Sequence, residues 1–107
     1  MPRRGEIWWV RLDPTVGSEI QKTRPCIVLT ANVLNQQRRT VVVIPLSTSS
    51  QINPPLMVPV MCAGRHAVAV IDQIRAVSKA RLDRRIGALA AEELAAVEAA
   101  LGDVLEL

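Results

Sequence analysis

The strongest structural signal in the sequence is a run of four successive β-branched residues, three valines and an isoleucine at positions 41–44, which follows Thr40. Branching at Cβ restricts side-chain rotamers in a helix and favours extended backbone. Pro45 then marks the end of the expected strand, at residues 40–46. A chain with this feature near its centre is expected to fold around a β-sheet.

Other short apolar runs predict further strands. Residues 6–12 alternate between two faces, and residues 26–29 are apolar on both faces, as in a central strand whose start Pro25 marks. Strands are also expected at 56–61 and 67–71, around a turn at Gly64, with continuation through 74–77. Between them lie two polar loops, 15–23 and 47–55, and a connection at 32–39 with room for one helical turn. These expected strands do not alternate with helices.

The last part of the chain has a helical pattern. From Ala90 onward it is rich in Ala, Glu and Leu, and its larger apolar residues recur at steps of three, four and three. Those residues are Leu94, Val97, Leu101 and Val104. The expected fold is mainly β with helical additions: a small antiparallel barrel carrying one C-terminal amphipathic helix.

Length and composition bound the organisation. At 107 residues, of which 50% are hydrophobic and 21% charged, the chain is expected to form a single domain spanning 1–107. No apolar stretch is long enough to cross a membrane, and no apolar segment follows the first residues, so we expect a cytoplasmic protein. Cys26 and Cys62 sit inside apolar runs and are expected to be reduced core thiols.

Charge is distributed unevenly along the chain. Residues 1–85 hold all 13 basic residues, 11 of them arginine, against five acids, a balance of +8; residues 86–107 hold five acids and no base. Arginine makes forked contacts with phosphate, so the basic part is a candidate surface for a polyanion. An ordinary solvated arginine-rich surface explains the same composition.

The chain has too few histidines and clustered acidic residues for several kinds of catalytic site. The one histidine, His66, opens an apolar run, so a two-histidine acid–base pair is impossible within the chain and a serine–histidine–aspartate triad has no distinctive nucleophile motif. Half of the ten acids lie in the tail and the others are scattered, which disfavours a metal site. We expect neither metal nor other cofactor.

The polar side chains collect at strand ends, where they can converge. Glu19, Lys22 and Arg24 flank the second strand, and a hydroxyl run begins at Ser47. Such groups can hold phosphate and orient a nucleophile that the substrate already carries. RNA carries one in its 2′-hydroxyl.

Several segments of the sequence resemble those of a known protein family. The segment from Arg4 to Pro25 contains Gly5-Glu-Ile-Trp-Trp9, Leu12-Asp-Pro14 and Lys22-Thr-Arg-Pro25, and it resembles the opening of the MazF/PemK/Kid family of type II toxin–antitoxin systems. The likeness continues through residues 26–29, the run ending at Ser47, the Asp72-Gln-Ile-Arg75 and Lys79-Ala-Arg-Leu82 segments and the terminal helix.

The resemblance implies an SH3-like barrel of five to seven strands that acts as a homodimer. It also implies a metal-independent endoribonuclease, or mRNA interferase. Such enzymes cleave single-stranded RNA (mRNA) at short sequences, leave a 2′,3′-cyclic phosphate and a 5′-hydroxyl, and are inhibited by a cognate acidic antitoxin. An acidic, partly disordered antitoxin would compete with RNA for one basic groove.

The resemblance also implies site residues. Arg24 matches the family's catalytic arginine, and Ser47 matches its catalytic hydroxyl residue, usually threonine; because Thr48 comes next, either hydroxyl could orient the phosphate. Glu19 matches an active-site glutamate, and Asp72 and Gln73 match a pair near the RNA; Glu19 or Asp72 is a hypothetical base. The remaining candidates for RNA binding are Gln21, Lys22 and Ser49.

This chain also departs from the pattern. Some family members have an arginine where Val70 stands and a histidine where Ser18 stands, so the acid–base assignment of those members does not transfer intact. Two other functions stay open: a gyrase-inhibiting toxin of the same fold, and a catalytically silent module that binds RNA or antitoxin. The tail lacks the tryptophan through which the gyrase-inhibiting toxins act.

Overall fold

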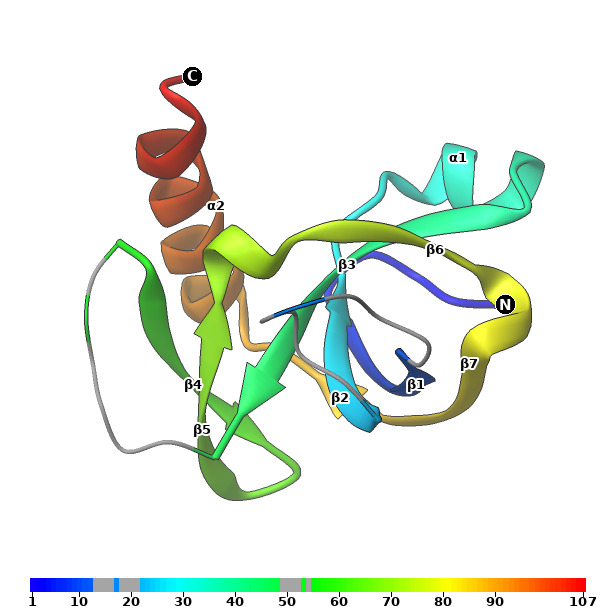
Figure 1. The fold of residues 1–107 in the computed structure, drawn as a ribbon, viewed down its shortest axis with the longest axis horizontal. Coiled ribbons are helices and arrows are strands. Elements are labelled where there is room, and N and C mark those ends of the chain that lie inside the picture. Colours follow the sequence, from blue (N-terminus) through cyan, green and yellow to red (C-terminus); the bar gives the residue numbers. More distant parts are fainter. Residues whose placement is uncertain (13–16, 18–21, 49–52, 54) are drawn as a thin grey trace.

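The computed structural model describes residues 1–12, 17, 22–48, 53 and 55–107. Its elements in chain order are β1 (Glu6–Arg11), β2 (Thr23–Val28), α1 (Asn32–Gln37), β3 (Thr40–Ser47), β4 (Met57–Cys62), β5 (Arg65–Val70), the 3-10 turn η1 (Ile71–Gln73), β6 (Arg75–Ser78), η2 (Lys79–Arg81), β7 (Leu82–Ala88) and α2 (Ala91–Leu105) (Figure 1). The predicted fold class is confirmed: the strands form a curled antiparallel sheet, with a helix at the C-terminal end.

The sheet is organised around β3. Its strands follow the order β4-β5-β3-β2-β1-β7, and β6 also pairs with β3. One edge of β3 pairs with β2, while the other pairs first with β6 and then, at its end, with β5. Since the hydrogen-bonded path runs from β4 to β7 and curls on itself, the sheet makes a half-barrel.

Alternate residues of the central strands serve two separate cores. In β2, Ile27 packs with one cluster, and Cys26 and Val28 pack with the other. In β3, Ile44 and Leu46 belong to the first, and Val41 and Val43 to the second. Both faces of these strands are buried, which explains their continuous apolar sequence.

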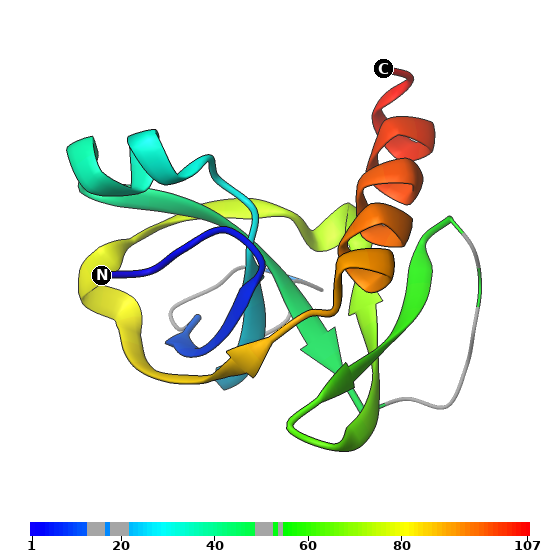
Figure 2. The same cartoon turned by 180° about the vertical axis from the view of Figure 1, so that it is seen from behind.

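Helix α2 covers the first core (Figure 2). Val97 and Ala100 are buried in it, and Leu94, Leu101 and Val104 pack against it, as the helical spacing predicted. The Glu93 carboxylate accepts hydrogen bonds from the amide of Ala90 at 2.9 Å and from the amide of Met61 in β4 at 2.7 Å. The first turn of the helix is thereby tied to the β4–β5 hairpin.

Both prolines that were expected to bound strands lie inside them. Pro25 is in β2, opposite Trp9 of β1. The pairing of β2 with β3 begins only at Cys26, so on that edge of β2 no strand needs the amide hydrogen that proline lacks. Pro45 is in β3 between Val43, which pairs with β6, and Leu46, which pairs with β5. Each proline is accommodated where a neighbouring strand is absent.

One strand had no sequence signal. β7 contains three consecutive charged residues, Asp83, Arg84 and Arg85, so it lacks the apolar pattern that indicates a strand. It forms because it is an edge strand that pairs with β1 and needs few buried side chains. Among the described residues, no helix is long and apolar enough to span a membrane.

Candidate active site

A cavity of about 320 Å³ lies between the β4–β5 hairpin and strands β1, β2 and β7. Trp9, Pro25, Leu46, Ala67 and Ile86 supply much of its apolar wall. Its polar or charged side chains are Arg24, Ser47, Thr48, Arg65 and His66. The structure thus brings together all three residues predicted as catalytic, along with two that were not predicted.

Strand register places Arg24 and Ser47 on one face of the sheet. Cys26 pairs with Pro45, and Arg24 precedes Cys26 by two residues while Ser47 follows Pro45 by two. Because side chains alternate along a strand, both point to the same side as that pair. β2 and β3 are not paired beyond Cys26 and Pro45, so Arg24 and Ser47 share a face without being cross-strand partners, and Pro25 and Leu46 of the apolar wall point to the opposite face.

His66 joins that face from the other side of β3. Ser47 pairs with Val68 of β5, and His66 lies two residues before Val68. Three neighbouring strands therefore present Arg24, Ser47 and His66 on the same side. Thr48 comes after the last residue of β3 and is exposed, whereas Ser47 is half-buried.

A tight turn holds the hairpin that carries His66. Ala63 and Gly64 both have positive φ, 50° and 80°, which is the backbone of the two-residue turn that best fits strand twist. This turn sets Arg65 opposite Cys62 and His66 opposite Met61. The positions of both new site residues are therefore fixed by local hairpin geometry.

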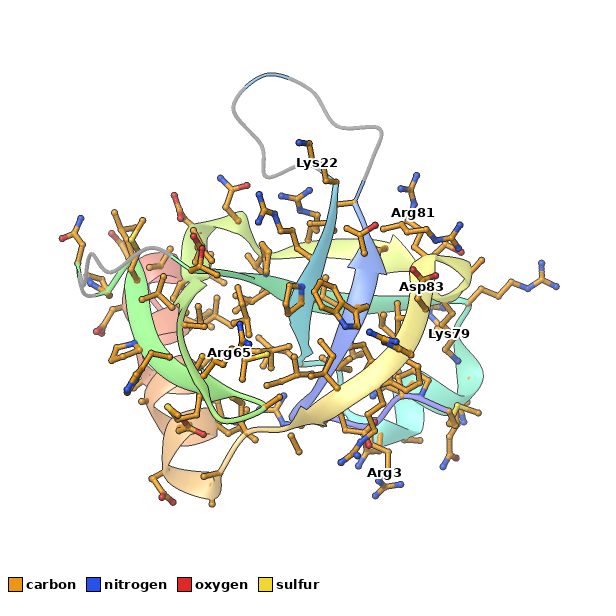
Figure 3. All side chains as sticks on the ribbon, turned by 90° about the horizontal axis from the view of Figure 1, so that it is seen from below. Arg3, Lys22, Arg65, Lys79, Arg81 and Asp83 are labelled. Carbon is orange, nitrogen blue, oxygen red and sulfur yellow. The ribbon has the colours of Figure 1, made fainter. Side chains whose placement is uncertain are left out.

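The two cavity arginines have no compensating charge among the described residues. In the part of the chain that the structure describes, neither the Arg24 nor the Arg65 guanidinium has an ion-pair or hydrogen-bond partner. Figure 3 shows the Arg65 side chain in the space between the β4–β5 hairpin and β2. Two unpaired guanidinium groups beside an apolar wall form a site suited to an anion, and phosphate in particular.

Neither cysteine supplies a reactive thiolate. Burial raises the pKa of the Cys26 thiol to about 12, although the charge of Arg75 opposes the shift. Burial also raises the pKa of Cys62, which lines the cavity and, as a partly buried residue, packs against the first core. Both thiols are free, and both are protonated near neutral pH.

Lys22 lies in a second, more open pocket of about 560 Å³ that is lined by Arg11, Lys22, Thr23, Ser78, Ala80 and Arg81. Figure 3 shows Lys22 and Arg81 at the same edge of the molecule. Arg11 also pairs with Asp83, at 3.1 Å between Nε and Oδ1. The pocket keeps a basic character, with three cationic side chains around it.

Asp72 and Gln73 are not among the described residues that line the Arg24 cavity. They lie in η1, where Asp72 is exposed and Gln73 is half-buried. Gln73 Oε1 accepts a hydrogen bond from Arg75 Nη2 at 2.9 Å, and the Gln73 carbonyl accepts one from Arg75 Nε at 3.3 Å. Glu19, Gln21 and Ser49 lie outside the described residues.

The sequence pattern gave no reason to select Arg65 or His66. His66 lies at the start of an apolar run, which indicates a strand and not a site. Arg65 is one of 11 arginines, and no motif distinguishes it from the others. Only the pairing of β5 with β3, which joins segments about 20 residues apart, brings both residues to the cavity, and because they are consecutive in a strand their side chains point to opposite faces of the sheet. Within the described residues, no group of three or more His, Cys, Asp or Glu side chains could hold a metal ion.

Comparison with known proteins gives a consistent set of relatives. Residues 3–105 match the model of the family described as PemK-like, MazF-like toxin of type II toxin–antitoxin system. The chain is 34% identical to endoribonuclease MazF9 of Mycobacterium tuberculosis, with 100% of this chain and 98% of the relative covered. It is 33% identical to the endoribonuclease toxin MazF of Escherichia coli, with 92% and 89% covered.

Solved structures share the fold. The crystal structure of MazF from Deinococcus radiodurans superposes with a TM-score of 0.89 at 24% identity, covering 99% of this chain and 97% of that one. The Mycobacterium tuberculosis toxin MazF-mt6 gives a TM-score of 0.78 at 27% identity, with 95% and 97% covered. A mycobacterial endoribonuclease in complex with its cognate antitoxin gives 0.84 at 20% identity, with 100% and 97% covered.

Proposed function

The chain belongs to the PemK-like, MazF-like toxin family of type II toxin–antitoxin systems, and we propose that its Arg24 cavity is where it cleaves single-stranded RNA without a metal ion. The chain is a MazF-like endoribonuclease toxin. One observation carries the assignment of the site: Arg24 and Ser47 share a face of the sheet and a cavity, and Arg24 has no acidic partner in the described part of the chain.

The chemistry follows from the groups available. The 2′-hydroxyl oxygen attacks the adjacent phosphorus, and the 5′-oxygen leaves, giving 2′,3′-cyclic phosphate and 5′-hydroxyl ends. Negative charge grows on the phosphoryl oxygens in the transition state, and the fixed charge of Arg24 stabilises it there. The nucleophile is already part of the substrate, so no metal-bound water is needed to supply it.

Ser47 is the hydroxyl that we assign to the phosphate. It stands on the same sheet face as Arg24, and β3 holds it within a regular strand. Thr48 lies past the last residue of β3, where backbone pairing does not fix its direction. A hydroxyl that shares a sheet face and a cavity with Arg24 can donate one hydrogen bond to a phosphoryl oxygen that the guanidinium also binds.

The partners follow from the family and from charge. We propose that the chain acts as a homodimer in the cytoplasm, where mRNA is found, and that a cognate antitoxin binds and inhibits it; similar structures are solved as complexes with their antitoxins. The excess of basic residues before position 86 attracts an acidic peptide as well as RNA. Saturating antitoxin is therefore expected to displace bound RNA.

The experiment that tests this function is cleavage of a long, defined single-stranded RNA in excess EDTA. Wild type is compared with Arg24→Ala, and with Arg38→Ala as a matched control for loss of one exposed arginine. Site-specific cuts that end in 2′,3′-cyclic phosphate, persist in EDTA and disappear only in Arg24→Ala support the proposal. A folded wild-type protein that cuts no RNA of varied sequence would favour the gyrase-inhibiting or silent-binder alternatives.

A further inference from the structure

We propose that His66 is the general base of this enzyme, accepting the proton of the attacking 2′-hydroxyl. The proposal rests on the proposed function, because it assigns a further residue of the same cavity. It starts from a gap in the chemistry: attack by the 2′-oxygen requires loss of a proton, and neither arginine nor serine accepts one readily near neutral pH. Histidine is the side chain that ordinarily changes charge in that range.

Position is the first support. His66 lines the cavity together with Arg24 and Ser47, and strand register puts all three on one side of the sheet. Its side chain is exposed, and it has no ion-pair or hydrogen-bond partner in the described part of the chain. An imidazole in this state has a lone pair that it can offer to a bound substrate.

Among the residues described, His66 is the one imidazole of the cavity, and none of the other groups there is a good proton acceptor. The charged groups there are the guanidinium groups of Arg24 on β2 and Arg65 on β5. β4 contributes the Cys62 thiol, whose pKa burial raises, and β7 contributes only the apolar Ile86. From α2, the Glu93 carboxylate accepts hydrogen bonds from the amides of Met61, opposite His66, and of Ala90.

Of the two carboxylates considered from the sequence, Glu19 lies outside the described residues, and Asp72 is less suited to this role. Asp72 lies in η1 and is not among the described residues of the cavity wall. His66 therefore supplies, from the β4–β5 hairpin, an acid–base group on the sheet face that Arg24 and Ser47 share. Arg24, on the same face of the sheet, would hold the scissile phosphate and so place the 2′-hydroxyl near the imidazole.

The proton balance of the step is complete. The 2′-oxygen bonds to phosphorus while its proton passes to an imidazole nitrogen of His66. The bond between phosphorus and the 5′-oxygen breaks, and the 5′-oxygen takes a proton from water. The hydroxide left behind is neutralised when the imidazolium gives up its proton, so the enzyme returns to its starting state.

The test is a single-turnover cleavage assay between pH 5 and 8 with wild type, His66→Gln and a matched hairpin control, Met61→Gln. Met61 is the partner of His66 in β4 and does not line the cavity. We expect His66→Gln to cleave about 100-fold more slowly and to lose the rise in rate with pH below neutrality, while RNA affinity stays within a few-fold of wild type. Free imidazole should partly restore cleavage by His66→Ala.

A modified substrate separates base from acid. An RNA with sulfur in place of the bridging 5′-oxygen has a leaving group that needs no proton, so the loss in His66→Gln should persist with it. If that loss vanishes, His66 acts as an acid and the proposal is wrong. Two other results would contradict the proposal, provided that Arg24→Ala abolishes cleavage. In one, His66→Gln keeps the wild-type rate and pH profile; in the other, His66→Gln loses RNA binding. A wild type that cuts no RNA would instead overturn the proposed function itself.

Discussion

At the scale of single residues, the arrangement of β3 separates two adjacent hydroxyls that the sequence left equivalent. Ser47 is within the strand and on the Arg24 face, and Thr48 is beyond it. We expect Ser47→Ala to lower the single-turnover cleavage rate by about 100-fold, because a hydrogen bond to the transition state is lost. Thr48→Ala should lower it less than about threefold.

The conservative variant Ser47→Thr completes that comparison. It keeps the hydroxyl and adds a methyl group that limits χ1, so it should retain cleavage close to wild type. Rates from a quenched time course with one defined RNA check all three variants. A greater loss in Thr48→Ala than in Ser47→Ala would assign the hydroxyl to Thr48.

Glu6 is a residue whose charge stabilises the fold. Burial alone would raise its pKa, but hydrogen bonds outweigh that effect and lower the pKa below the ordinary 4.5. Oε1 accepts from Trp8 Nε1 at 3.1 Å and from the Arg3 amide at 2.7 Å, and Oε2 accepts from Arg85 Nε at 2.7 Å. The carboxylate form is therefore favoured by folding.

The sign of the pH effect follows from this lowered pKa. Glu6 contributes stability above the ordinary pKa of 4.5, and that contribution is lost as pH falls through the lower folded value. We expect Glu6→Gln to reduce the free energy of unfolding by roughly 1 kcal/mol at pH 7 and by less at pH 3. Urea unfolding at both pH values measures it. An equal loss in the exposed control Glu92→Gln would show that the Glu6 contacts are not the cause.

At the scale of elements, the β4–β5 hairpin carries His66 and has a strained backbone at Ala63 in its turn. Ala63 has a φ of 50°, a region where Cβ is crowded, and Gly64 beside it has 80°. We expect Ala63→Gly to raise the free energy of unfolding by about 1 kcal/mol, since glycine adopts this backbone without strain. Ala95→Gly, at an exposed position within α2, should lower it by about 1 kcal/mol. A loss of stability in Ala63→Gly would contradict this account of the turn.

Much of the element pattern could be predicted from the sequence, because apolar periodicity records which faces are buried. The strand at 41–44 and the helix carrying Val97 were recognised in this way. Pro25 and Pro45 were misplaced because their tolerance depends on which neighbouring strand is absent, a property of the whole sheet. For the same reason His66 was not predicted as a site residue: its role depends on pairing with distant segments.

At the scale of the whole molecule, two basic pockets open at the edges of the curled sheet. The cavity of Arg24 holds the proposed chemistry, and the pocket of Arg11, Lys22 and Arg81 is larger and more open. We propose that a single strand of RNA whose reacting phosphate lies in the first pocket also contacts the second. The second pocket would then add affinity through phosphate contacts without taking part in the reaction.

Salt dependence of binding tests that division of roles. Lys22→Gln should weaken RNA binding and reduce the slope of log K against log salt by about 0.7, the value for one phosphate contact with single-stranded nucleic acid. The cleavage rate at saturating RNA should stay unchanged, and Arg38→Gln should leave the slope as it is. Fluorescence anisotropy with labelled RNA at several salt concentrations gives these values. An unchanged slope in Lys22→Gln would remove the second pocket from the RNA path.

The central claim for the molecule is that its cavity promotes attack by the RNA's own 2′-hydroxyl, with no metal ion. The most direct test uses a cleavable RNA in which one nucleotide, the one before the cut bond, carries a 2′-deoxy sugar. The account predicts that wild type binds this RNA about as tightly as the all-ribose strand and does not cut it at that bond, with or without EDTA. Cleavage there at a comparable rate would contradict the account, because the nucleophile would have to come from elsewhere.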